Sequence, residues 1–168
     1  RTTGNAEAVR AMDDVLQAQA EHWLVRETIG LWRRTLSRLD VSSRSLFALI
    51  ESGSCFVGTF FELALACDRS YMLSLPDTPE QAPRIGLTAM NWGHYPMATG
   101  QSRLGRRFYD EAAALEAART QTGQALEGDA AMALGLVTAN PDDLDWDDEI
   151  RIAIEERVAM SPDALTGM

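Results

Sequence analysis

The chain has 168 residues, a formal net charge of −10 and an apolar fraction of 46%, which suits one domain with its own core. All fifteen basic residues are arginines, and the acidic balance would repel a polyanion, so we expect no nucleic-acid partner. No apolar run reaches the length of a transmembrane helix, so we expect no membrane partner either.

Cysteine and histidine are scarce. The two cysteines, Cys55 and Cys67, lie among apolar residues, which is typical of buried reduced thiols and predicts a cytoplasmic protein. The two histidines, His22 and His94, show no spacing typical of zinc ligands, so we expect no metal. The sequence begins abruptly in RTTGNAEAV without a methionine, and we therefore expect an internal piece of a longer polypeptide.

Residues from about 5 to 39 carry apolar side chains at helical spacing. They predict one long helix or two abutting helices, with Gly30 as the expected break. One face of this segment is basic because it carries Arg26, Arg33, Arg34 and Arg38. Such a face could contact the phosphates of a ligand or a partner subunit, or it could be an ordinary surface on which arginine stems cover apolar atoms. We favour the surface interpretation.

A short apolar strand, Leu46–Ile50, leads into a loop of small residues and then into an apolar helical run with one carboxylate, Glu62. Small residues let a ligand approach the backbone closely, and the first amides of a helix have no intrahelical acceptor. An anion beside Gly58 and Thr59 would therefore meet unpaired N–H groups. The apolar neighbours of Glu62 should desolvate it and raise its pKa, which suits proton transfer near neutral pH. The stretch predicts an oxyanion hole beside a general acid or base.

Strands and helices alternate in the rest of the chain, which predicts an α/β layered fold. A strand is expected at Ser70–Leu75, followed by an exposed loop at residues 76–84. Further helices are expected at about residues 101–109, 111–120 and 147–160. Gly135 fits the position just after a helix end, and Asp145 should cap the last of these helices. The segment Ser161-Pro162-Asp163 ends that helix and has the composition to start another.

The segment Glu62–Asp68, ELALACD, resembles the signature of the crotonase (enoyl-CoA hydratase/isomerase) superfamily. That signature joins a strand, a glycine-rich loop and a helix that ends in Cys-Asp. The loop of this chain departs from it, because Gly58-Thr59-Phe60 stands where a run of glycines is usual. The flanking sequences WRRTLSRLDVSSRSLFALIE and NWGHYPMATGQSRLGRRFY are similar to a narrower, ring-opening group within the superfamily.

The resemblance implies a crotonase-like ββα spiral, of which residues 1–168 would form a single domain holding only the later turns. A long N-terminal helix and C-terminal helices would accompany those turns. A short helix at about residues 126–135 would end at Gly135 and pass to a final short strand. The missing N-terminal turns carry much of the coenzyme A pocket and one of the two oxyanion amides in this family. Members of the family associate, so we expect a homo-oligomer.

A second catalytic glutamate is expected four residues before a glycine in this family, after a short strand. If Gly93 is that glycine, Ala89 stands where the glutamate would be, and the chain is not a typical hydratase. The polar and aromatic residues nearby are candidate substitutes: Asn91, Trp92, His94 and Tyr95. Asn91 could orient a water. His94 titrates in a suitable range, or it could be a loop histidine with a satisfied hydrogen bond.

The ring-opening group implies a carbon–carbon lyase acting on an aromatic acyl-CoA thioester. The family reaction hydrolytically opens 2,3-epoxybenzoyl-CoA to a semialdehyde CoA ester and formate. By this resemblance, the Thr59 N–H would stabilise the enolate oxygen, Gly58 would allow close approach, and Glu62 would shuttle the proton. Coenzyme A would be part of the substrate, so no separate cofactor is expected. Aromatic side chains would wall the ring or simply form core: Phe56, Phe60, Phe61 and Trp92.

Two other functions stay open at this point. A generic hydratase or isomerase would turn over crotonyl-CoA, although Ala89 argues against it. A catalytically inactive, crotonase-like assembly module would oligomerise without binding CoA esters, and the long amphipathic N-terminal helix and the missing glutamate suit it.

Overall fold

A computed structural model describes residues 1–161, 163 and 164. Its α-helices are α1 (Ala6–Ala18), α2 (Trp23–Asp40), α3 (Phe61–Leu65), α4 (Arg103–Arg107), α5 (Ala112–Thr120), α6 (Gly128–Ala133) and α7 (Trp146–Val158). The strands are β1 (Phe47–Ile50) and β2 (Arg69–Met72), and two 3₁₀ helices are η1 (Gly58–Phe60) and η2 (Ala89–Asn91). Pro162, part of the predicted start of a further helix, lies outside the described residues. No described helix combines the length and apolar character needed to cross a membrane.

The two strands pair in parallel, with Phe47 opposite Arg69 and Ile50 opposite Met72. Parallel neighbours need a crossover, and here it consists of η1 and α3. The predicted strand at Leu46–Ile50 is confirmed. The second strand begins earlier and ends sooner than Ser70–Leu75, because beyond Met72 the chain pairs only through an isolated bridge at Ser74.

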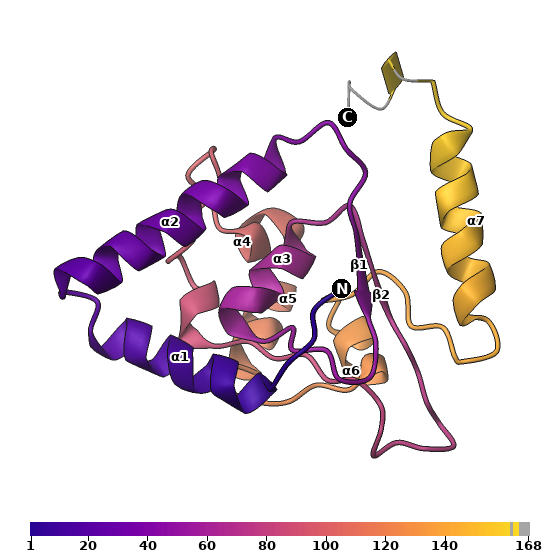
Figure 1. Cartoon of the computed structure of the whole chain (residues 1–168), viewed down its shortest axis with the longest axis horizontal. Helices are drawn as coiled ribbons and strands as arrows, with labels where there is room; N and C mark the ends of the chain where they lie inside the picture. Colours follow the sequence, from indigo (N-terminus) through magenta and orange to yellow (C-terminus); the bar gives the residue numbers. More distant parts are fainter. Residues whose placement is uncertain (162, 165–168) are drawn as a thin grey trace.

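The side chains of β1 alternate between two cores. Ala48 and Ile50 point into the main core, which β2, α3, α4, α5 and α6 also line. Phe47 and Leu49 face the other way and pack in a smaller cluster with Trp146 of α7. This is the period of two that a strand imposes. The sheet therefore lies between the central helices and α7, while α1 and α2 form an angled pair at the opposite edge (Figure 1).

The N-terminal segment forms two helices, but the predicted break at Gly30 is wrong. The chain turns at residues 19–22, where His22 adopts an extended conformation and its Nδ1 accepts a hydrogen bond from the Leu24 N–H at 3.3 Å. Gly30 lies inside α2. A mid-helix glycine costs only about 1 kcal/mol relative to alanine. The apolar face of α2, which packs through Ile29 and Leu36, offsets that cost.

The short strands expected near residues 84–93 and after Gly135 do not form. Ile85 bridges to Leu126 and Gly86 bridges to Val57, so adjacent residues pair with different segments and no ladder extends. The segment after Gly135 likewise makes only isolated bridges to Tyr71 and Ser74. Gly135 itself follows α6 in a left-handed conformation, with φ of 70°, as its predicted role requires.

The later helices are shorter than expected. The helix predicted at 101–109 spans only Arg103–Arg107, and a turn with Asp110 at a φ of 61° separates it from α5. Asp145 occupies the N-cap position of α7, as predicted, but its side chain makes no capping hydrogen bond there. Asp142 instead accepts hydrogen bonds from the N–H groups of Leu144 and Asp145, each at 3.0 Å.

Candidate active site

The loop before α3 turns Glu62 into the protein interior. Gly58 has a left-handed φ of 49°, and its N–H donates to the Gly86 carbonyl at 2.9 Å. The chain then winds through η1 directly into α3, the first turn of which contains Glu62. As a result Glu62 is 2% exposed, although it is ionisable. A buried carboxyl needs hydrogen-bond partners, and two side chains supply them.

Asn91 and Arg103 hold the two oxygens of Glu62. Asn91 Nδ2 donates to Oε1 at 2.8 Å, and Arg103 Nη1 donates to Oε2 at 3.0 Å. Burial raises the pKa of Glu62 above its ordinary value of 4.5, although the Asn91 hydrogen bond and the Arg103 charge act in the opposite direction. Glu62 is therefore a fixed carboxyl with raised proton affinity.

Arg103 is itself buried and joins two carboxylates. Its Nε and Nη2 donate to the two oxygens of Asp40 at 2.9 and 2.6 Å, while Nη1 also donates to the Tyr95 carbonyl at 2.9 Å. The side chains of Arg103 and Asp40 are 2% and 3% exposed. This geometry ties α2, α3 and α4 together at Glu62.

Asn91 links Glu62 to the Gly58 loop. Its Nδ2 donates to the Gly58 carbonyl at 2.9 Å as well as to Glu62, and its Oδ1 accepts from the Thr88 N–H at 2.9 Å. Both Nδ2 protons are thus used within the protein. The predicted water-orienting role would have to use the second lone pair of Oδ1, and it stays a prediction.

The Thr59 N–H, the predicted oxyanion donor, points at a carboxylate of the protein itself. It donates to Asp13 Oδ2 at 2.9 Å, and the Thr59 hydroxyl donates to Asp13 Oδ1 at 2.5 Å. Asp13 comes from α1 and is 1% exposed. The expectation of an unpaired N–H at this position is therefore wrong for this conformation of the chain.

Tyr95 joins the same cluster. Its hydroxyl lies 2.9 Å from the Thr59 hydroxyl. Because the single proton of Thr59 Oγ1 goes to Asp13, Tyr95 must be the donor in this contact. Burial raises the pKa of Tyr95 to about 12, so its hydroxyl keeps that proton at neutral pH. The structure thus brings together five predicted residues: Gly58, Thr59, Glu62, Asn91 and Tyr95.

The other predicted contacts lie outside this hydrogen-bonded cluster. Phe56 is buried in the main core, and the ring of Phe60 packs on Trp32 with centroids 5.5 Å apart. Trp92 donates from Nε1 to the Thr122 hydroxyl at 3.0 Å. His94 is half-buried and makes no hydrogen bond or ion pair to the described residues. Substrate contact by these four side chains stays a prediction.

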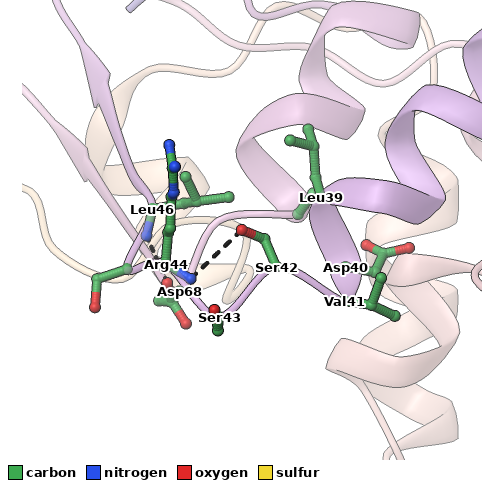
Figure 2. Close-up of a pocket in the computed structure, with 10 residues that line it drawn as sticks. Leu39, Asp40, Val41, Ser42, Ser43, Arg44, Leu46 and Asp68 are labelled. Carbon is green, nitrogen blue, oxygen red and sulfur yellow. Dashed lines mark hydrogen bonds between the residues drawn. The ribbon is translucent and has the colours of Figure 1, made fainter. Parts of the chain in front are cut away.

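Ala89 faces a cavity of about 310 Å³ between α1 and the turn at Thr122. The cavity is lined by Arg10, Asp14, Thr88, Ala89, Thr122 and Gly123. A methyl group thus stands at the wall where a second glutamate was expected. A separate pocket lies between the end of α2 and the start of β1 (Figure 2). There the Leu46 N–H donates to Asp68 at 2.7 Å, and none of the predicted site residues lines it.

Metal ligands and phosphate-binding arginines were the two other kinds of binding group considered in the sequence. Within residues 1–161 and 163–164, no three His, Cys, Asp or Glu side chains gather as metal ligands would. Three exposed arginines of α2, Arg33, Arg34 and Arg38, line a groove of about 390 Å³ with the loop from Pro96 to Gly100. Arg26 does not line this groove, so only part of the predicted basic face borders it.

Comparison with known proteins finds no matching family model. The chain is 58% identical over all 168 residues to benzoyl-CoA-dihydrodiol lyase of Aromatoleum evansii, and it spans 30% of the length of that relative.

Solved structures with a similar fold include an enoyl-CoA hydratase/carnithine racemase from Magnetospirillum magneticum. Its TM-score is 0.65 at 22% identity, over 91% of this chain and 52% of that one. An enoyl-CoA hydratase from Bacillus halodurans gives a TM-score of 0.64 at 16% identity, over 92% of this chain and 58% of that one. The chain has the fold of these hydratase structures and is similar over its full length to part of benzoyl-CoA-dihydrodiol lyase. The fold predicted from the ELALACD segment is therefore confirmed.

Three residues that hold this site together were missed in the sequence. Asp13 had a visible signal, because it falls on the face of α1 that also carries Val9 and Leu16, and a carboxylate on a buried face requires partners. Thr88 and Arg103 had none. Only the tertiary contacts show that Thr88 bonds Asp13 and that Arg103 pairs with Glu62.

Replacing Gly58 by Ala is expected to destabilise the chain more than replacing Gly53 by Ala. Both glycines are left-handed, so each variant incurs backbone strain of about 1–2 kcal/mol. An added Cβ at Gly58 would also overlap Asp13 and Thr88, whereas nothing lies within 4 Å of one at Gly53. Overpacking of this kind adds about 1–3 kcal/mol. Urea unfolding of both variants measures the difference, and equal losses would contradict the close approach at Gly58.

Proposed function

We propose that the protein containing this chain is a carbon–carbon lyase that hydrolytically opens the ring of an aromatic acyl-CoA thioester. The expected reaction converts 2,3-epoxybenzoyl-CoA to a semialdehyde CoA ester and formate. The observation that carries this proposal is the identity of 58%, over the full length of the chain, to a protein named benzoyl-CoA-dihydrodiol lyase. Because the chain spans 30% of that relative, the activity is proposed for the longer protein.

The proposed mechanism uses the thioester as an electron sink. As negative charge develops on the thioester oxygen, the Thr59 N–H would donate to it, and Gly58 would let it approach the backbone. Donors aimed at developing charge typically contribute about 10²–10³ in rate each. The hydrogen bond from the Thr59 N–H to a carboxylate at 2.9 Å supports this assignment, because it shows that an anionic oxygen fits there.

Glu62 would move the proton. Its burial, its raised pKa and the two side chains that fix its orientation support this role. Asn91 would hold Glu62 in a fixed position relative to the Gly58 loop, since its Nδ2 donates to both the Glu62 carboxyl and the Gly58 carbonyl. The aromatic wall of Phe56, Phe60 and Trp92 belongs to the same proposal.

Coenzyme A would arrive as part of the substrate, and no other cofactor enters the proposed chemistry. A cytoplasmic location and a homo-oligomeric assembly stay predictions.

The test is formate release from 2,3-epoxybenzoyl-CoA by the natural polypeptide that contains this chain, with crotonyl-CoA as the control substrate. We expect formate from the epoxide and no hydration of crotonyl-CoA, because Ala89 removes half of a hydratase's acid–base pair. Turnover of crotonyl-CoA alone would assign the protein to the hydratases. Inactivity toward both would indicate an assembly module.

A further inference from the structure

The carboxylate of Asp13 sits in a cradle of three donors. Its Oδ2 accepts from the Thr59 N–H at 2.9 Å and from the Thr88 hydroxyl at 2.6 Å, and its Oδ1 accepts from the Thr59 hydroxyl at 2.5 Å. Both threonines are buried, at 0% and 8% exposed. We call the Thr59 N–H and the hydroxyls of Thr59 and Thr88 the Thr59–Thr88 cradle.

The donors of the cradle are all neutral. Among the described residues Asp13 makes no ion pair, so hydrogen bonds alone stabilise its charge. Hydrogen bonds to an ionised acceptor are short and roughly twice as strong as neutral ones. Three of them converge on one carboxylate from two separate segments of the chain, residues 58–60 and 88. The arrangement is that of a site for an oxyanion, and α1 supplies the occupant.

A ligand oxygen at the Thr59 N–H and the Asp13 carboxylate exclude one another. The N–H has one proton, and Asp13 Oδ2 already accepts it. Asp13 also covers the bare face of Gly58, since an added Cβ there would overlap Oδ2. Two anionic oxygens in this space would repel each other in a buried site. A ligand must therefore displace Asp13 before it reaches the N–H.

Displacement of Asp13 requires that α1 shifts. Three of its residues are buried, namely Val9, Asp13 and Leu16. A turn at residues 19–22 separates it from α2, so α1 can move without unwinding that helix. Arg10 adds hydrogen bonds to the carbonyls of Gly123 and Gln124 at 3.2 and 3.3 Å. These hydrogen bonds, and the packing of Val9 and Leu16 in two apolar clusters, are the contacts that a shift of α1 must loosen.

We propose that the Thr59–Thr88 cradle is an oxyanion-binding site that the chain closes with its own Asp13, and that a substrate oxyanion or a small carboxylate displaces Asp13 to bind there. The part that concerns the substrate rests on the proposed function. The part that concerns a small carboxylate does not, because formate or acetate would use the same three donors.

The first experiment tests the cradle without any activity. The variant Asp13→Ala, made in the natural polypeptide, leaves three buried donors unpaired and should have a lower Tm than the wild type. Sodium formate should raise the Tm of this variant more than sodium chloride does. The wild type and Asp14→Ala should gain less from formate than Asp13→Ala does, because Asp13 still competes for the cradle in both, and Asp14 is an exposed neighbour outside it. Equal effects of formate and chloride on Asp13→Ala would overturn the proposal.

The second experiment measures competition with the substrate, using benzoyl-CoA as an unreactive thioester. If the cradle of the wild type is open about one tenth of the time, vacating it should tighten benzoyl-CoA binding about tenfold. We expect this gain for Asp13→Ala and not for Asp14→Ala. A lower or unchanged affinity of Asp13→Ala, or an equal gain in Asp14→Ala, would overturn the displacement of Asp13 by substrate.

The two experiments separate this proposal from the proposed function. Formate-specific stabilisation of Asp13→Ala in a protein that binds no benzoyl-CoA would support the cradle and contradict the lyase. If Asp13→Ala does not fold, Asp13→Asn replaces it, because the neutral amide keeps the shape of the side chain and competes less well for the Thr59 N–H. Its benzoyl-CoA affinity should then exceed that of the wild type, and an unchanged affinity would overturn the proposal.

Discussion

Arg103→Met is expected to destabilise the chain by about 3–5 kcal/mol, because it leaves two buried carboxylates without their cation. Arg103 pairs with Glu62 at 3.0 Å and with Asp40 at 2.6 Å, and all three side chains are 2–3% exposed. Methionine fills a similar volume, so the loss would come from the charges and not from a cavity. Urea unfolding monitored by tryptophan fluorescence measures it.

Arg106→Met is the matched control for Arg103→Met. Arg106 lies on the same short helix, but it is exposed and only packs over the Tyr109 ring at 5.8 Å. We expect a change of about 0.5 kcal/mol or less, as for surface substitutions. Arg103→Met should also cost much less when Glu62 and Asp40 are already replaced by Gln and Asn. A similar cost in both backgrounds would show that Arg103 acts through packing and not through its charge.

If the longer protein catalyses the proposed ring opening, Glu62→Gln in it is expected to lower kcat for formate release by about 10²–10⁴-fold, the usual contribution of a general acid or base. Glutamine keeps the shape of Glu62 and can still accept the hydrogen bond from Asn91, but it cannot carry a proton. Because the proton moves in the transition state, kcat should fall much more than KM rises. Steady-state kinetics on 2,3-epoxybenzoyl-CoA give both constants.

Glu80→Gln provides the control for this variant, because it removes the same charge at an exposed position in the loop after β2. Its kcat should equal that of the wild type. Circular dichroism should show that Glu62→Gln is folded. Full turnover by a folded Glu62→Gln protein would eliminate Glu62 as the acid or base.

Local signals in the sequence located the strand–loop–helix unit correctly. The apolar run ending at Ile50 became β1, and the apolar run around Glu62 became α3. Prediction worked less well where partners far away in the chain decide the outcome. The family resemblance implied a short strand near residues 84–93, yet Ile85 and Gly86 each bridge to a different segment, so no strand forms there. The break between α1 and α2 lies near residue 20, where His22 caps α2. Gly30, which the sequence indicated as the break, lies inside that helix.

The sequence by itself determined that this chain has the crotonase fold and that Glu62 would be a buried carboxyl beside a tight glycine loop. The fold follows from the resemblance of the ELALACD segment to the crotonase signature, and the burial of Glu62 follows from its apolar neighbours in the chain. Only the tertiary structure decided what surrounds Glu62 and Thr59. Asp13 lies 46 residues from Thr59, and Arg103 lies 41 residues from Glu62. A hydrogen bond between such distant residues leaves no periodic pattern in the sequence. Burial removes the Glu62 carboxyl and the Thr59 N–H from solvent, so both need hydrogen-bond partners within the protein. Only the tertiary packing shows which side chains those partners are.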